Sequence, residues 1–215
     1  MNLDSSIYDG FGVTPEDVET YVSSDVGLYG VEVSRLSSYL LVQLASAWKH
    51  RTLSTSSITG VIQSLEGVRQ RGKLPRTKSF KGAALSGLWK VHFVDPQFLI
   101  RNIYNEWGMF HEASQKFAAL CARVAKEEER EPSPLGWQGR LAHEFVIGGY
   151  EHRARKGKLT GEWLIFGIHE GERIYLALCQ HSSSPAEDKK IYEALRELCG
   201  GEFPALFPDS AQQGA

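Results

Sequence analysis

Two short runs rich in β-branched, aromatic and other apolar residues, Trp163–Ile168 and Ile174–Cys179, flank a turn at Glu170-Gly171. Strand-forming runs joined by a short turn that contains glycine are the local pattern of a β-hairpin. The second run leads to His181 and then to a serine-rich break. A side chain at a strand end has a fixed root and access to solvent, which suits catalysis. His181 is therefore a candidate functional residue.

The hydrophobic periodicity of the remaining chain predicts mainly helices. Thr14-Pro15 has the cap and first-turn residues of a helix start, whereas residues 1–13 are expected to be irregular. Alternating residues favour a strand from Leu88 to Val94. The helix that starts at Thr14-Pro15 is expected to end near Ser23. Further helices are expected over residues 33–50, 95–107, 111–130 and 137–145, and two more begin at Thr55 and Ser184. We also expect a break at Gly148-Gly149 and a basic loop at 152–158.

These elements indicate an α+β fold, in which a helical N-terminal region precedes a small antiparallel sheet with packed helices. We expect the helical region over residues 1–79, the α+β region with the hairpin over 80–207, and a disordered tail over 208–215. Residues 70–79 are polar, basic and interrupted by glycine and proline. They are the best candidate for an exposed connection.

Cysteine usage and hydropathy indicate the compartment. Cys121, Cys179 and Cys199 are far apart and form no Cys-x-x-Cys pair, so free thiols in a reducing cytoplasm are expected. No apolar run reaches the roughly 18 residues of a membrane helix, and no secretory signal is visible at the N-terminus. The sequence therefore predicts a cytoplasmic protein without a membrane partner.

The net charge of −2 hides an uneven distribution. Residues 1–34 contain acidic residues and no lysine or arginine, whereas residues 47–92 are basic, with Glu66 as their acidic residue. A local basic field can attract phosphate, although a solvated surface beside an acidic arm also explains the pattern. The candidate nucleic-acid-binding residues are Arg71, Lys73, Arg76, Lys78, Lys81 and Lys90.

Several enzyme motifs are missing. The chain has no Gly-x-Ser-x-Gly elbow, no Gly-x-x-x-x-Gly-Lys-Ser/Thr phosphate loop and no Gly-x-Gly-x-x-Gly fingerprint. The histidines and cysteines lack the spacing of a compact zinc site. We therefore expect no cofactor and no metal.

Histidine and basic residues without a metal suit the cleavage of RNA, which supplies its own 2′-hydroxyl nucleophile. The protein then needs a base, an acid and cations that stabilise the developing charge. His181 is the candidate acid or base, and Arg153, Arg155 and Lys158 are the candidate phosphate ligands. The alternative is that these residues only keep a surface loop solvated.

The segment Glu162-Trp163-Leu164-Ile165-Phe166-Gly167-Ile168, a turn, and Arg173-Ile174-Tyr175-Leu176-Ala177-Leu178-Cys179-Gln180-His181 resembles the C-terminal end of RelE/YoeB-type toxins. The resemblance covers about 40 of the 215 residues and implies a ribosome-associated mRNA endonuclease that is paired with an antitoxin. By position it assigns the functional strand-end residue to His181. The family's preceding strand usually opens with a functional arginine, where this chain has Glu162-Trp163. Arg153 or Arg155 would have to replace that charge.

Three function classes follow. The leading hypothesis is a metal-independent endoribonuclease that acts on RNA or at the ribosome. The alternative is a non-enzymatic protein–protein interaction module, such as a regulator, an antitoxin or a phage-type inhibitor, that uses the hairpin and the tryptophan-rich helices. A nucleic-acid binder without catalysis is the third. Steep salt dependence separates phosphate binding from an apolar protein interface.

Overall fold

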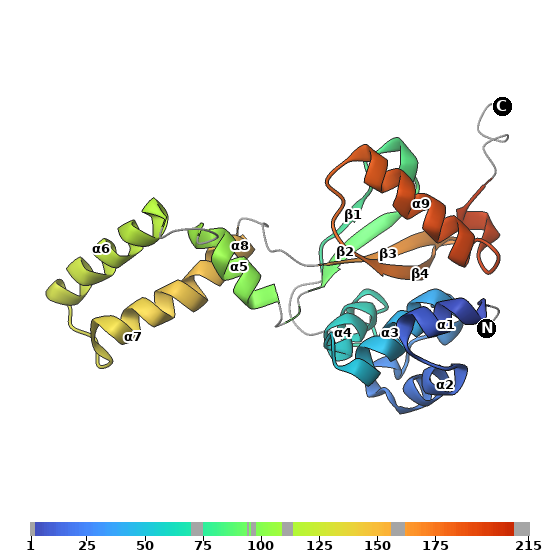
Figure 1. The fold of residues 1–215 in the computed structure, drawn as a ribbon, viewed down its shortest axis with the longest axis horizontal. Coiled ribbons are helices and arrows are strands. Elements are labelled where there is room, and N and C mark those ends of the chain that lie inside the picture. The colour runs from blue at the N-terminus through green and yellow to red at the C-terminus, as the bar shows by residue number, and fades with distance from the viewer. Residues whose placement is uncertain are drawn as a thin grey trace. The chain divides into compact units, whose positions relative to one another are not determined.

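The computed structural model describes residues 3–69, 75–93, 95, 98–108, 114–155 and 162–208. The protein has an α+β fold and divides into two compact units (Figure 1). Unit 1 comprises residues 1–94 and 161–215, and unit 2 comprises residues 95–160. Unit 2 is thus an insertion in the chain of unit 1, and neither boundary falls at residue 79.

Unit 1 begins with helices α1 (Ser5–Phe11), α2 (Pro15–Ser24), α3 (Ser38–His50) and α4 (Thr55–Leu65). The predicted start of α2 is confirmed, because Thr14 and Asp17 form a reciprocal capping box. The expectation of an irregular N-terminus is wrong, because Asp4 caps α1 and Gly12 ends it at a positive φ of 64°. Helix α3 was expected to start at residue 33 and starts at Ser38 instead, because Ser37 caps it and Val33–Arg35 is a 3₁₀ turn.

The sheet contains β1 (Thr77–Ser79), β2 (Trp89–Phe93), β3 (Glu162–His169) and β4 (Glu172–Cys179), in that order and antiparallel throughout. The predicted hairpin is confirmed. Glu170 and Gly171 have φ values of 52° and 83°, which is the geometry of a type I′ turn between two strands. The end of the expected connection 70–79 is the edge strand β1 instead of a loop, and residues 70–74 lie outside the described part.

Helices cover both faces of the sheet in unit 1 (Figure 1). Helix α9 (Pro185–Cys199) starts at the Ser184 cap, as predicted, and packs on one face with Leu195 and Cys199. The N-terminal helices pack on the other face. Since both faces are covered, Leu164, Ile165 and Phe166 are all buried, and β3 reads as a continuous apolar run instead of an alternating one.

The free edge of β4 is covered by the segment that leads into α3. The Ser37 amide donates to the Tyr175 carbonyl at 2.9 Å and the Ser37 hydroxyl donates to the Leu176 carbonyl at 2.5 Å. The Gln43 side chain pairs with both backbone groups of Leu178, at 3.0 Å to its oxygen and 2.7 Å to its nitrogen. Backbone groups that an edge strand leaves unpaired are thereby satisfied inside the protein.

A buried polar network lies between the N-terminal helices and the hairpin. The Tyr175 hydroxyl donates to the Glu66 carboxylate at 2.6 Å, and the Arg35 guanidinium contacts the other Glu66 oxygen at 2.6 Å. Burial raises the pKa of Tyr175, and the Glu66 carboxylate raises it further. The one acidic residue of the basic stretch therefore has a structural role.

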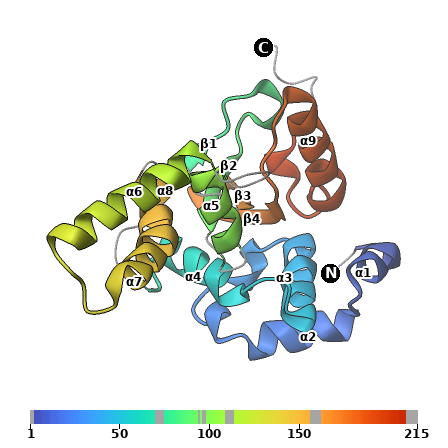
Figure 2. The same cartoon turned by 60° about the vertical axis from the view of Figure 1, so that its left-hand side comes forward.

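Unit 2 contains α5 (Phe98–Trp107), α6 (Gln115–Arg130), α7 (Gly136–His143) and α8 (Gly149–Arg155). Helices α6 and α7 form an antiparallel hairpin (Figure 2). The expected break at Gly148-Gly149 is wrong, because a π-helical turn, Glu144–Gly148, joins α7 directly to α8. The indole of Trp107 donates to the Phe145 carbonyl at 2.8 Å within this turn, and a side chain on Gly149 would meet that indole at 2.7 Å.

Two further expectations concern the basic segment 152–158 and the C-terminal tail. The basic segment expected as a loop over 152–158 is helical in α8 up to Arg155. The tail is described only to Pro208, so the expected disorder of 209–215 lies outside the described residues. None of the described helices has both the length and the apolar character needed to cross a bilayer.

We predict that Gln43→Met lowers the free energy of unfolding, because methionine keeps the length and leaves the backbone groups of Leu178 without partners. Each such buried group costs about 1–3 kcal/mol. Urea unfolding followed by circular dichroism measures the change. Gln180→Met, at the exposed position just beyond β4, is the matched control, and equal stability of the two variants would contradict the prediction.

Candidate functional site

Four side chains meet on the α9-facing side of the sheet, where β2, β3 and β4 lie next to one another. Lys90 and His92 belong to β2, and Trp163 on β3 is the direct cross-strand partner of His92. Trp163 in turn pairs with Cys179 on β4, and His181 follows two residues later. The hairpin register and the β2 alternation therefore place both histidines beside one tryptophan. We call Lys90, His92, Trp163 and His181 the histidine cluster.

The rings of the histidine cluster are in direct contact. The Trp163 indole donates from Nε1 to Nε2 of His92 at 3.3 Å. Nδ1 of His92 lies 3.2 Å from Nε2 of His181. The His181 ring stacks on Trp163, with centroids 4.6 Å apart and an interplanar angle of 24°. Trp163 is only 6% exposed, whereas both histidines are exposed, so the cluster has a buried base and an open surface.

A lysine completes the cluster. The Lys90 ammonium lies 3.5 Å from the centroid of the Trp163 ring and 4.3 Å from that of Phe80, which is cation–π geometry. Lys78 on β1 is the cross-strand partner of Lys90. Like charges in directly opposite positions destabilise a sheet. A bound anion would relieve this repulsion, so the pair is a candidate phosphate site.

Burial and neighbouring cations lower the pKa values of both histidines in the cluster. Burial lowers the pKa of His92 to about 4, and the charges of His181, Lys90 and Lys78 contribute. Burial also lowers the pKa of His181, with a contribution from Lys90. Both rings are therefore neutral at pH 7, and a neutral imidazole can accept a proton from a substrate.

The structure joins only some of the predicted site residues. His181, Lys90 and Lys78 lie together on the sheet of unit 1, while Arg76 and Lys81 are exposed on either side of β1. The other predicted residues belong elsewhere: Arg153 is in unit 2 and donates to Asn102 at 3.3 Å, Arg155 ends α8, and Arg71, Lys73, Lys158 and the side chain of Arg155 lie outside what the structure describes.

Two members of the cluster, His92 and Trp163, were not predicted to be functional residues. The predicted alternation over Leu88–Val94 already placed Lys90 and His92 on one face of the strand, which was the available signal. The pairing register between β2 and β3 could not be predicted from the sequence, because 68 residues of chain (94–161) separate the two strands. The Trp163 ring is buried like that of a core residue, but its indole N–H contacts a histidine instead of a structural carbonyl.

The cysteines of unit 1 do not belong to a reactive site. Burial raises the pKa of Cys179 to about 11 and that of Cys199 to about 12, so both remain thiols at neutral pH. All three cysteines are free. Within the described part of the chain, no three histidine, cysteine or acidic side chains converge as ligands for a metal ion.

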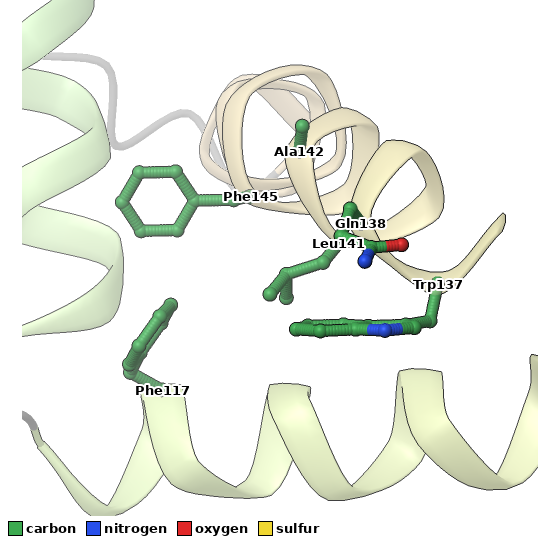
Figure 3. Close-up of a pocket in the computed structure, with 6 residues that line it drawn as sticks. All are labelled: Phe117, Trp137, Gln138, Leu141, Ala142 and Phe145. Atoms are coloured by element: carbon green, nitrogen blue, oxygen red, sulfur yellow. The ribbon is translucent and has the colours of Figure 1, made fainter. Parts of the chain in front are cut away.

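Unit 2 has a separate apolar hollow of about 290 Å³ on its α6–α7 hairpin (Figure 3). Phe117 and Phe145 meet edge to face, with ring centroids 5.4 Å apart, and Trp137 lies on the other side of Leu141 (Figure 3). The Trp137 side chain is 52% exposed. The remaining lining residues are Gln138, Leu141 and Ala142.

No protein-family model matches the chain, and no curated protein or solved structure matches it. The chemistry of the site therefore follows from its own side chains. Neutral imidazoles beside two lysines on an exposed face can bind a phosphate and move a proton next to it.

We predict that acid destabilises unit 1 through His92. The folded-state pKa of about 4 is below the value of 6.5 for an unperturbed histidine, so between these pH values the unfolded chain binds a proton that the folded chain does not. The free energy of unfolding therefore falls as the pH drops from 6.5 to 4. His92→Asn should flatten this pH dependence, as measured by urea unfolding at several pH values.

His169→Asn, at the exposed end of β3 beside the turn, is the control for this experiment. It should leave the pH dependence of wild type unchanged. An unaltered slope in His92→Asn would show that the pKa of His92 is not depressed in the folded protein.

Proposed function

We propose that unit 1 is a metal-independent endoribonuclease, and that RNA binds across the histidine cluster and Lys78. The observation that carries the proposal is the contact between two exposed, neutral histidines beside two lysines on one face of the sheet. The resemblance of the hairpin to RelE/YoeB-type toxins agrees with this class, with His181 at the same strand end.

The proposed reaction is transesterification within RNA. His181 takes the proton of a 2′-hydroxyl, and the 2′-oxygen attacks the adjacent phosphorus. The bond from phosphorus to the 5′-oxygen breaks, and the resulting imidazolium returns the proton to that leaving oxygen. The products are a 2′,3′-cyclic phosphate and a 5′-hydroxyl end. Lys90 and Lys78 stabilise the charge that develops on the phosphate oxygens.

The lysines also account for binding before chemistry. Lys78 is exposed and Lys90 is half-buried, so a phosphate can approach both through the open part of the α9-facing side of the sheet. Burial lowers the pKa of Lys90, and the charge of Lys78 lowers it further, while Asp188 opposes both. An approaching phosphate favours the charged form of Lys90 and strengthens its own binding.

We predict that the purified protein cleaves a labelled single-stranded RNA in EDTA and leaves a 2′,3′-cyclic phosphate. His181→Ala should reduce the rate by on the order of 10²–10⁴-fold, because a general acid–base group is lost. His169→Ala is the matched control, and the same oligonucleotide with 2′-O-methyl groups should remain intact. Product ends are identified by mass spectrometry.

The outcomes separate the function classes. Equal cleavage by wild type and His181→Ala would exclude His181 as the catalyst. RNA binding with a steep salt dependence but no cleavage would indicate a non-catalytic nucleic-acid binder. If the protein neither binds nor cleaves RNA, an RNA function for the histidine cluster is excluded.

The apolar hollow on unit 2 favours a second function, the binding of a protein. None of its six lining residues is charged, and Arg123 on α6 is paired with Glu127 and Glu144 at 3.0 and 2.9 Å. The surface therefore suits an uncharged, apolar helix face of a partner, and an antitoxin is the partner class that the toxin resemblance implies.

We predict that Trp137→Ala weakens binding of such a partner, because aromatic residues in partly open apolar sites dominate protein interfaces. The measurement is co-purification of the wild-type and variant chains from cells, followed by titration of the purified partner. Trp48→Ala, at an exposed tryptophan of α3 in unit 1, is the control. Identical partner recovery by both variants would contradict a role for the hollow.

A further inference from the structure

The proton positions in the histidine cluster can be deduced from one residue. An indole nitrogen is only a donor, so the contact from Trp163 Nε1 at 3.3 Å requires that Nε2 of His92 is an unprotonated acceptor. A neutral imidazole carries one proton, and in His92 this proton must therefore be on Nδ1. Trp163 thus selects the tautomer of His92.

The same reasoning extends to the second histidine. Nδ1–H of His92 points to Nε2 of His181, 3.2 Å away. Two protonated nitrogens would repel at this distance, so Nε2 of His181 must carry the lone pair and Nδ1 of His181 the proton. The chain of donors runs in one direction, from the Trp163 indole through His92 to His181.

We infer that Trp163 is a positioning residue, which acts through His92 to present Nε2 of His181 as a proton acceptor and Nδ1 of His92 as a hydrogen-bond donor. The inference rests on the proposed function only for the role of His181 as the base. It also names the substrate groups that fit: a hydroxyl that donates to His181, and an adjacent anionic oxygen that accepts from His92.

A ribonucleotide carries both groups next to each other, as the 2′-hydroxyl and an oxygen of the 3′-phosphate. Their binding would replace the hydrogen bond between the two histidines with one bond to each ring. Each histidine ring keeps the same number of hydrogen bonds, and Trp163 keeps its bond to His92 throughout. A deoxyribonucleotide lacks the hydroxyl, and Nε2 of His181 would lose its partner on binding.

Trp163 also holds the rings in place. Its indole stacks on His181 on one side and has the Lys90 ammonium 3.5 Å from its centroid. Phenylalanine at this position would keep an aromatic ring for both contacts and remove the N–H together with the second ring of the indole, a loss of volume that Trp89→Phe reproduces on β2. His92 would then be released to the opposite tautomer, and His181 would lose its lone pair at Nε2 whenever His92 accepts.

The tautomers are measured directly by ¹⁵N NMR of the histidine side chains in the full-length protein without RNA. In wild type, both His92 and His181 should show Nδ1 protonated and Nε2 unprotonated at pH 7. Trp163→Phe should shift His92 toward the Nε2–H form. The matched control is Trp89→Phe, because Trp89 is on the opposite face of β2 and stacks on Phe166.

Kinetics supply the second readout. Trp163→Phe should reduce kcat for RNA cleavage by on the order of 10²-fold, the size of a general acid–base contribution, and leave KM nearly unchanged. Trp89→Phe should change neither parameter. An Nε2–H tautomer for either histidine in wild type, or unchanged tautomers in Trp163→Phe, would overturn the inference. The predicted tautomers in a protein that does not cleave RNA would support the role of Trp163 and contradict the proposed function alone.

Discussion

Unit 1 depends on the closure of an open sheet edge. Strand β4 is the last strand of the sheet and is nonetheless buried, so its outward backbone groups have no access to water. Ser37 and Gln43 replace the missing strand by bonding to Tyr175, Leu176 and Leu178. The segment from Ser37 to Gln43 therefore completes a hairpin that lies about 135 residues later, and both belong to one unit.

The same sheet has an open region on its α9-facing side, and this is where its polar conflicts gather. Two lysines face each other on β1 and β2, and two exposed histidines meet edge to face beside a buried tryptophan. A structure selected only for stability would avoid such a pair of like charges. The arrangement is understandable as a site for an anionic substrate, with the buried N–H of Trp163 fixing the proton positions on the exposed rings.

The insertion of unit 2 explains which site residues the sequence could not bring together. His181 and Arg153 are close in the chain, and a basic loop feeding the hairpin was a reasonable interpretation of residues 152–158. In the structure Arg153 belongs to a helix that is packed through Asn102 on α5 in another unit. The cation beside His181 is instead Lys90 on β2, about 90 residues away in the chain, and its cross-strand partner Lys78 comes from β1, about 100 residues away.

Local sequence signals were sufficient to predict the features that local interactions decide. These are the α+β class, the hairpin with its glycine turn, the capped starts of α2 and α9, the strand around Val91 and the strand-end position of His181. Tertiary structure decided the register that places His92 opposite Trp163, the late start of α3 at Ser37, and the π-helical turn that carries the chain through Gly148-Gly149. The physical reason is that each of these depends on a partner distant in the chain: a neighbouring strand, the edge of β4, or the indole of Trp107. Helix caps and turns are satisfied within a few residues, whereas a site built across strands exists only after those strands have paired.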